Sequence, residues 1–410
     1  MANYYFQRDT KVFIHVPTTT AGTPAMFYEL PVLDGYSFSQ ATNTSEITLN
    51  QAQSNDESTP VSLRARQMFN DSYAPAEWSF STYMSPFQTA ATEDRGVNGI
   101  AGDDSGDHHE VSEALWAMFF SKLCSTTGGT GHGLNADGDN LSVVQSNANS
   151  ATVGVFDLYF VFGGAAMAYS SGKPANFTGS DIGVYKIKDC SVNEFSFDFD
   201  IDGIATVAWS GQGKIITDEG ALNLSASATL ITEGVCDVDG NARTNGFIRN
   251  RVSDLTLTPA SLNSGTAYAT TLTGGNITGT NNITYLTPET LGVVNQPLGH
   301  VTGTKSIGGN VTCYLDNASN ASADLFEDVI EATSDIQNSL SFAFDIGAGS
   351  GATADTVPYC LITLPTCHVE VPTINVEDVI SLETNFHALP SAIDSTNEIS
   401  VFDFYGITVG

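Results

Sequence analysis

The stretch from Val184 to Gly213 constrains the fold of this chain more than any other part of the sequence. Within it, apolar residues alternate with polar ones in the order Phe195, Ser196, Phe197, Asp198, Phe199, Asp200, Ile201 and Asp202. Successive side chains of a β-strand point to opposite faces, so this pattern predicts a strand with one apolar and one acidic face. Gly203 then allows a turn, and the residues up to Trp209 predict a second strand. Carboxylates side by side on one face repel each other, so a requirement other than strand stability must favour them.

The charge balance limits the partners of the chain. Its 410 residues are enough for two ordinary domains or one large β domain, and 41% of them are hydrophobic, which allows a packed core. Acidic residues number 46 and basic residues 14, which gives a net charge of −32. Such a surface repels phosphates and anionic lipids, so we expect no tight binding to nucleic acid or to a membrane.

Targeting and redox signals are weak. The sequence has no apolar run of about 18 residues, the length that predicts a membrane span. The first residues, MANYYFQRDTKVF, lack the basic and apolar regions of a signal peptide, so we expect none. The cysteines form no CxxC pair, and we expect buried free thiols in a reducing compartment. They are Cys124, Cys190, Cys236, Cys313, Cys360 and Cys367.

Helical spacing of apolar residues predicts two helices, at residues 111–123 and 323–333. Strand patterns occupy residues 76–85, 154–163, 306–315, 339–346 and, as a strand pair, 359–389. Stretches rich in Gly, Ser and Asn predict loop insertions at about 125–152 and 164–183. The polar residues 51–61 predict an exposed loop or hairpin tip.

The predicted elements follow the same order in both halves of the chain, and Cys190 and Cys367 fall at equivalent points. Identity between the halves is weak, so the match is one of pattern, and the alternative to a duplication is coincidence. We expect a mainly β (α+β) fold with two tandem similar domains, residues 1–240 and 241–410. Each would be a β-sandwich or curled sheet with one packed helix.

Several acidic clusters could carry chemistry, but each has a simpler interpretation. The group from Asp103 to Glu110 could bind a metal, although a solvated loop that also caps the following helix explains it. The pairs Asp137/Asp139 and Asp237/Asp239 lack the ligand spacing and the closing Glu of a calcium loop. Acids that share one strand face do not flank a sugar ring as glycosidase carboxylates do. No nucleophile, zinc-protease, phosphate or dinucleotide motif is present, so we expect no enzyme, no catalytic residue, no cofactor and no metal.

The segment VYKIKDCSVNEFSFDFDIDGIATVAWSGQGKI resembles the β-hairpin region of tail tube proteins from tailed bacteriophages. The strand AEWSFSTYM, the helix containing ALWAMFF and the segment FIRNRVSDLTL are similar too. The resemblance covers most of the chain and is best at 76–123, 154–217 and 247–257. It implies a structural virion protein whose rings stack into the hollow tube that conducts the genome. A duplicated chain resembles the kind in which three subunits supply six similar domains.

The resemblance also implies partners and a location. The partners are further copies of the chain in homotrimeric rings stacked head-to-tail, a tape measure protein in the lumen, and the tail terminator and baseplate or tail-tip proteins. A contractile tail adds a sheath protein. Double-stranded DNA is present in transit only, and no membrane is involved. The protein is expected in the virion tail, after assembly in the host bacterial cytoplasm.

Acidic residues are the expected lining of the lumen, because a channel for DNA should not bind a polyanion. The expected lumen-facing acids are Asp198, Asp200, Asp202, Glu370 and Glu377, and the expected inter-ring loop contains Asn55, Asp56 and Glu57. Two other classes stay open. A surface adhesin, receptor-binding or capsid-decorating β protein would show exposed aromatics or a sugar cleft. A glycoside hydrolase would lose activity when Asp198 or Asp200 is neutralised.

Overall fold

The computed structural model describes part of the chain, and all structural statements below concern that part. The described residues are 4–16, 26–48, 51–53, 61–63, 66–84, 88–89, 108–109, 112–120, 134–137, 140–143, 153–163, 169–170, 173–174, 177–178, 181–199, 203–222, 229–232, 248–259, 265–291, 293–331, 340–347, 359–376, 378–392, 395 and 397–405.

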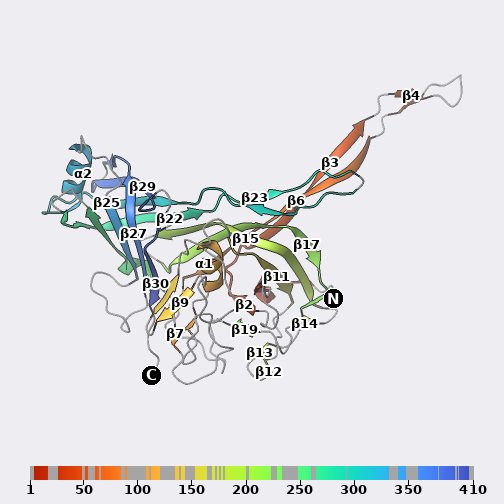
Figure 1. Cartoon of the computed structure of the whole chain (residues 1–410), viewed down its shortest axis with the longest axis horizontal. Helices are drawn as coiled ribbons and strands as arrows, with labels where there is room; N and C mark the ends of the chain where they lie inside the picture. Colours follow the sequence, from red (N-terminus) through yellow and green to blue (C-terminus); the bar gives the residue numbers. More distant parts are fainter. Residues whose placement is uncertain are drawn as a thin grey trace.

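The described residues form a mainly β fold with two α-helices, as the sequence predicts (Figure 1). The first half contains β1 (Lys11–Val16), β2 (Met26–Leu30), β3 (Ser37–Thr48), β4 (Gln51–Gln53), β5 (Val61–Leu63), β6 (Arg66–Tyr83), β7 (Gln88–Thr89), β8 (His108–His109), α1 (Glu113–Phe120), β9 (Leu134–Asp137), β10 (Asn140–Val143), β11 (Phe156–Phe162), β12 (Tyr169–Ser170), β13 (Lys173–Pro174), β14 (Phe177–Thr178), β15 (Gly183–Phe199), β16 (Thr206–Gly213), β17 (Ile215–Asp218), β18 (Ala221–Leu222) and β19 (Thr229–Thr232). The second half contains β20 (Asp254–Pro259), β21 (Tyr268–Thr270), β22 (Leu272–Thr280), β23 (Thr284–Leu286), β24 (Gly299–Val301), β25 (Ser306–Tyr314), α2 (Ser322–Glu331), β26 (Leu340–Ile346), β27 (Tyr359–Val369), β28 (Thr373–Asn375), β29 (Ser381–Ala388) and β30 (Val401–Tyr405). Short 3-10 helices cover Gln7–Asp9 and Asn250–Val252.

Strand β15 belongs to two layers of the sheet. Its first part, residues 183–190, pairs with β11 and β17, while its second part, residues 191–199, pairs with β16 and β22. The change of partners follows Asp189, whose φ of 51° lies in the left-handed region that Asp tolerates better than most residues. A bulge between Val192 and Glu194 adds to the bend, because a bulge increases local twist.

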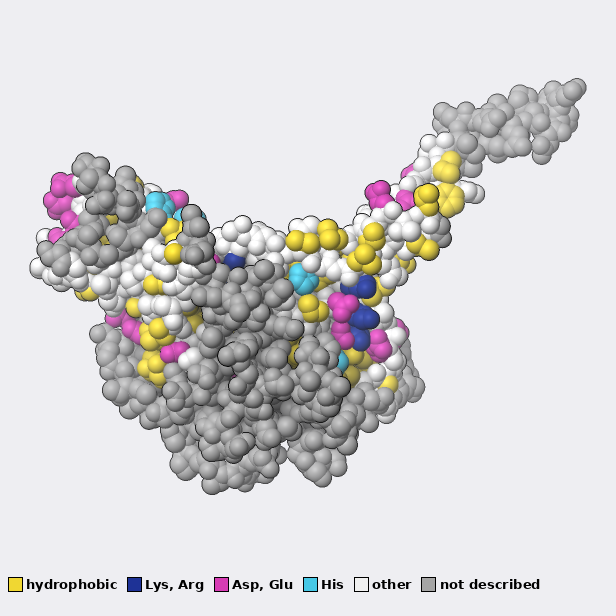
Figure 2. All heavy atoms as spheres, viewed as in Figure 1, with side chains coloured by type: hydrophobic (Ala, Val, Ile, Leu, Met, Phe, Trp, Pro, Cys, Tyr) yellow, Lys and Arg dark blue, Asp and Glu magenta, His cyan; other side chains and the backbone are white. Residues whose placement is uncertain are grey.

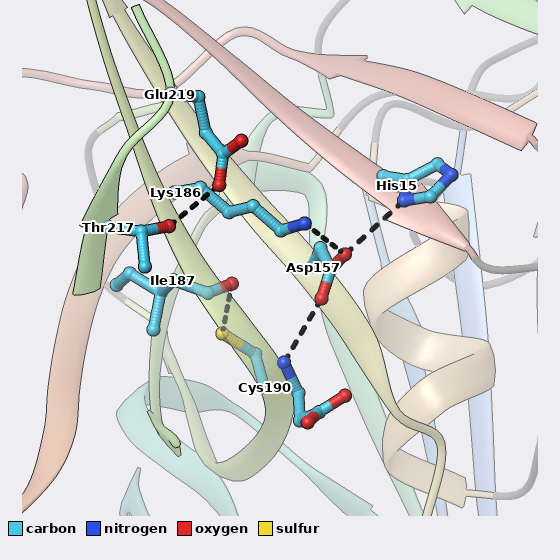
Figure 3. A network of polar contacts seen from close by, with 8 residues as sticks. His15, Asp157, Lys186, Ile187, Cys190, Thr217 and Glu219 are labelled. Carbon is cyan, nitrogen blue, oxygen red and sulfur yellow. Dashed lines mark hydrogen bonds and ion pairs between the residues drawn. The ribbon is translucent and has the colours of Figure 1, made fainter. Parts of the chain in front are cut away.

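A buried carboxylate holds this bend (Figure 3). Asp157 on β11 accepts a hydrogen bond from the backbone N–H of Asp189 at 3.1 Å and lies 2.9 Å from the Lys186 ammonium. His15 Nδ1 lies 3.5 Å from the same carboxylate. Burial raises the pKa of Asp157, but hydrogen bonds from His15, Asp189 and Lys186 outweigh burial and leave the pKa below its ordinary value. The ionised carboxylate is therefore part of the folded structure.

The second half repeats the pairing order of the first. Strand β27 pairs with β26 and β30 in its first part and with β29 in its last three residues. Phe156 opposes Cys190 in the first half, and Leu340 opposes Cys367 in the second. A register shift follows each pair at the same distance, between Phe156 and Leu158 and between Leu340 and Phe342. The pairs β1–β11 and β1–β2 correspond to β20–β26 and β20–β21. The pairs β3–β6 and β6–β16 correspond to β22–β25 and β25–β29.

The two helices occupy corresponding places but differ in burial. All eight residues of α1 are buried, and its Trp116 ring contacts Trp209 and Phe195 of the first half and Phe402 of the second. In α2 the described side chains buried from solvent are Ser322 and Leu325. Both helices lie where the sequence predicts them, at 111–123 and 323–333, and α2 begins one residue earlier than predicted. Val111 and residues 121–123, 332 and 333 lie outside the described residues. The aromatic ring of Trp116 thus joins the two halves in one hydrophobic cluster.

The two halves are also joined by strand pairing, which we call the internal joint. Residues 194–199 of β15 pair antiparallel with residues 275–280 of β22. Phe197 opposes Ile277 there, and each is 1% exposed. Gly279 is required because a Cβ at this position would lie 2.2 Å from the Phe195 ring. A second contact comes from the stretch predicted as an insertion at 125–152, in which β10 pairs with β30.

Strands β3 and β6 continue beyond the sheet as a long hairpin, which we call the arm (residues 41–48 and 66–75). It projects away from the rest of the chain (Figure 1), and hydrophobic side chains follow it on the surface (Figure 2). Ile47, Met68 and Phe69 are exposed on it. The predicted hairpin tip agrees with the pairing of β4 and β5, while residues 54–60 lie outside the described part.

We predict that Asp157→Asn destabilises the protein by about 3 kcal/mol at neutral pH, because it leaves the Lys186 ammonium buried without its partner. The lowered pKa of Asp157 means that its contribution is present above the unfolded value of about 4 and is lost as the pH falls below it. Urea unfolding at neutral and acid pH measures both effects. Glu331→Gln on the exposed end of α2 is the control. A cost for Asp157→Asn that does not shrink at acid pH would contradict this assignment.

Candidate assembly surface

The surface with a consistent chemical character is the polar face of the strands that run from β3 through the internal joint to β28. The alternation predicted in β15 sets this face: Phe195 and Phe197 are buried, whereas Glu194 and Asp198 are exposed on the opposite side. Segments 37–41, 76–83, 191–198, 206–213, 275–280, 306–314, 368–375 and 381–388 contain no Lys or Arg. Their acids are Glu77, Glu194, Asp198, Glu370 and Glu383, and all are exposed.

A row of amides crosses this face between two of the predicted lumen acids. Asp198 opposes Asn276, Asn276 opposes Asn310, and Asn310 opposes Asn385 on successive strands. The Asn385 amide donates a hydrogen bond to Glu370 Oε2 at 2.8 Å. Asp198 and Glu370 therefore lie on one polar face and mark the two ends of one row, but they do not touch.

The other predicted positions cannot be placed. Asp200, Asp202, Glu377, Asn55, Asp56 and Glu57 lie outside the described residues. The predicted lumen acids do not include Glu77, Glu194 or Glu383, because they were taken from the acidic run at 198–202 and from its counterpart around Glu370 and Glu377. The period-two pattern of AEWSFSTY and SLETNFHA was available to find two of them, since Trp78 and Phe386 mark the buried sides.

Two strand edges border this face, one in each half. We call them the β3 edge (residues 37–41) and the β28 edge (residues 371–376). In the described structure, β3 pairs only with β6, and β28 pairs only with β29. The β28 edge exposes apolar side chains: Val371, Ile374 and Val376 are 64%, 43% and 76% exposed. An unpaired strand edge with apolar side chains is a template for pairing with another chain.

Near the internal joint, the segment between β22 and β25 (residues 281–305) lies on the first half. The Asn193 side-chain oxygen accepts a hydrogen bond from the Ile283 N–H at 2.8 Å. The Tyr285 hydroxyl donates to the carbonyl oxygen of Asp189 at 2.6 Å. Asn295 exchanges backbone hydrogen bonds with Asp71 and Tyr73 at the base of the arm. The second half thus fixes the direction in which the arm leaves the first half.

Alternative chemistries receive no support from the described residues. Within them, no group of three His, Cys, Asp or Glu could hold a metal ion. Of the acidic cluster at 103–110, only His108 and His109 are described, as the short strand β8. Asp139, Asp237 and Asp239 lie outside the described part. Among the helices that the structure describes, none is long and apolar enough to cross a membrane.

The thiols within the described residues are inert in character. Cys190, Cys313, Cys360 and Cys367 are buried thiols that form no disulfide among the described residues, whereas Cys124 and Cys236 lie outside the described part. Burial raises the pKa of Cys313 to about 11 and that of Cys367 to about 12. The nucleophilic thiolate is therefore scarce at neutral pH.

Comparison with known proteins gives one informative match. No protein-family model matches the chain. Tail tube protein pb6 of Escherichia phage T5 is 28% identical to it over 394 residues, which are 95% of this chain and 74% of that protein. This similarity confirms the resemblance to tailed-bacteriophage tail tube proteins.

We predict that the four described thiols do not react with iodoacetamide in the folded protein at about pH 8, where an ordinary thiol with a pKa of about 8.5 reacts readily. Peptide mass spectrometry identifies the alkylated positions, and unfolding in urea before alkylation is the positive control. Alkylation of Cys313 or Cys367 in the folded protein would contradict the burial described here.

Proposed function

We propose that this chain is a structural subunit of a phage tail tube, in which three copies close into a ring and the rings stack head-to-tail. The observation that carries the proposal is the internal joint. It pairs β15 of the first half with β22 of the second, and the strands that correspond to these two in the other halves form the free β28 and β3 edges. The similarity to a tail tube protein supports the structural role.

The strand registers predict which residues meet when the free edges pair. In the internal joint, Ser196 opposes Thr278. The cross-strand pairs Ser191–Gln212 and His368–His387 occupy matching positions in the two halves. Ser196 follows Ser191 by the same number of residues as Thr373 follows His368, and each stretch passes one bulge, so Thr373 corresponds to Ser196.

The partner residue follows from the same reasoning on the other side. Thr278 opposes Gly308, which opposes His387. In the first half, Ser39 opposes Glu77, which opposes Gln212. Ser39 therefore corresponds to Thr278. We expect Thr373 of one copy to oppose Ser39 of the next.

Apolar burial provides the driving force for this joint. The same mapping places Ile374 opposite Phe38 of the next copy, as Phe197 lies opposite Ile277 within the chain. Ile374 is 43% exposed in the single chain, whereas Phe197 and Ile277 are 1% exposed. Covering the β28 edge removes apolar surface from water and supplies partners for unpaired backbone groups.

Two similar halves in each copy make the ring close with three chains and six similar joints, three internal and three between copies. The match of bulges and registers between β15 and β27 supports a duplicated domain, with residues 1–240 and 241–410 as its two units. The arm projects from the rest of the chain (Figure 1) and is the element that would reach the next ring. The loop predicted to contact that ring contains Asn55, Asp56 and Glu57.

The polar face is the proposed inner wall of the tube. Hydroxyls, amides and acids cover it, and its described segments contain no Lys or Arg. Duplex DNA binds surfaces that release counterions from its phosphates, so a wall without Lys or Arg lets it slide. Of the predicted lumen acids, Asp198 and Glu370 lie among the described residues of this face, and we propose that Asp200, Asp202 and Glu377 extend it. The proposed partners are the tape measure protein, the tail terminator and the tail-tip or baseplate proteins. The proposed location is the virion tail.

We predict that Ser39→Cys combined with Thr373→Cys yields disulfide-linked multimers on mild oxidation, because opposed strand residues have Cβ atoms about 5 Å apart. Non-reducing electrophoresis and electron microscopy of rings provide the readout. The matched control pairs Ser39→Cys with Val379→Cys, which is exposed but outside the register. Equal cross-linking in both variants, or none in either while rings form, would overturn the edge register.

We predict that Glu194→Lys with Asp198→Lys leaves ring formation intact but slows DNA ejection from virions, because two cations per copy would bind passing phosphates. The control is Glu331→Lys on α2, which changes the charge equally away from the polar face. Time-resolved dye exclusion measures DNA release. Unchanged ejection with normal assembly would remove the polar face from the lumen.

A further inference from the structure

We propose that the joint between copies is strengthened by protonation of His368 and His387, whose places in the internal joint are taken by Ser191 and Gln212. The inference rests on the proposed function, because it concerns the surface on which the β3 edge and arm base of a second copy would lie. Histidines and acidic side chains lie close together near β29 on the surface (Figure 2).

The two joints differ in chemistry at corresponding positions. The cross-strand pair Ser191–Gln212 of the first half corresponds to the pair His368–His387 of the second. The bulge residue Asn193 corresponds to Glu370. Three neutral side chains in one joint are thus replaced by two imidazoles and a carboxylate in the other.

In the internal joint these positions are contact points. Asn193 accepts a hydrogen bond from Ile283, the Ser191 hydroxyl lies 3.3 Å from His300 Nδ1, and the Gln212 carbonyl accepts from Tyr285 at 3.2 Å. All three donors or partners belong to the segment that follows β22. The corresponding segment of a neighbouring copy follows its β3, so it would cover Glu370, His368 and His387.

The charges around this place are mostly negative. Glu370 Oε1 lies 3.9 Å from His387 Nε2, and their side chains are 50% and 55% exposed. On the packed strands, β29 adds Glu383, while β25 presents Gly308 and Asn310, and β28 presents Thr373 and Asn375, none of which is charged. The second copy would bring Glu77 on β6, with Glu46, Arg66 and Asp71 further along its arm.

The sign of the effect follows from these charges. With neutral imidazoles, joint formation brings Glu77 of the second copy toward Glu370 and Glu383, and like charges repel. When the imidazoles are protonated, His387 neutralises the charge of Glu370. His368, which opposes His387 on the neighbouring strand, adds a second positive charge. Imidazoles change charge between about pH 5 and 8, so acidification favours the joint.

The test measures the concentration dependence of ring formation by sedimentation velocity, with the full chain at constant ionic strength. For the wild type we expect about tenfold tighter association at pH 6 than at pH 8. The association constant changes tenfold over each pH unit in which one group takes up a proton on association. The variant H368S/H387Q/E370N copies the neutral first-half residues and should associate equally at both values. Glu331→Gln is the matched charge control and should keep the wild-type ratio.

The outcomes separate this inference from the proposed function. Wild-type rings of equal affinity at both pH values, or a triple variant that retains the tenfold ratio, would overturn the pH-sensitive joint and leave the ring intact. Absence of rings at every pH would overturn the proposed function itself. Circular dichroism confirms that the variants fold. Glu370→Gln alone, which leaves both imidazoles, should reduce the ratio, and an unreduced ratio counts against the proposal.

Discussion

The hydrogen bond from the Asp189 N–H to the buried Asp157 carboxylate is the contact on which the rest of the structure depends. It holds a residue with positive φ at the point where β15 leaves one layer and enters another. The Lys186 ammonium compensates the charge of Asp157, and His15 adds a hydrogen bond, so the carboxylate stays ionised although it is buried. Without this bend, β15 could not pair with β11 and also with β22, and the two halves would lose their shared sheet.

The second half reaches the same bend by other means. Strand β27 has the same bulge opposite its cysteine but no buried ion pair there, since Thr366 occupies the place of Asp189 and Ser341 that of Asp157. A tyrosine does recur: Tyr28 and Tyr268 occupy corresponding positions, and both face an acidic residue of the adjacent helix. Burial and Glu113 raise the pKa of Tyr28, and the Tyr268 hydroxyl donates to Asp328. The two halves thus share the register shift that follows the cysteine pair, and in the first half the Asp157 carboxylate is the polar group that holds the bend.

Sequence reasoning predicted the elements that carry strong local periodicity. The alternation of Phe195 to Asp198, the two helices and the parallel order of elements in the halves are local patterns, and the described structure contains these elements where the patterns place them. The arm was missed as an extension of β3, because NTSEIT has no buried side to reveal a strand and its pairing with β6 comes from distant residues. Pairing of β10 with β30 was unpredictable for the same reason. The acidic face was found only in part, since Glu77 and Glu383 stand alone in their own strands and join Asp198 only across the sheet.

The internal joint has a consequence for how mutations act. Because β15 and β22 belong to one chain, that joint forms at an effective concentration set by the intervening chain and not by the amount of protein. In the proposed ring, three chains need two bimolecular association steps, whereas six single-domain subunits would need five. A substitution in β22 acts on a joint that is already formed within the folded chain. Val371 and Val376 are exposed on the β28 edge of the single chain, so a substitution there changes the surface that this edge offers to another chain with less effect on the core.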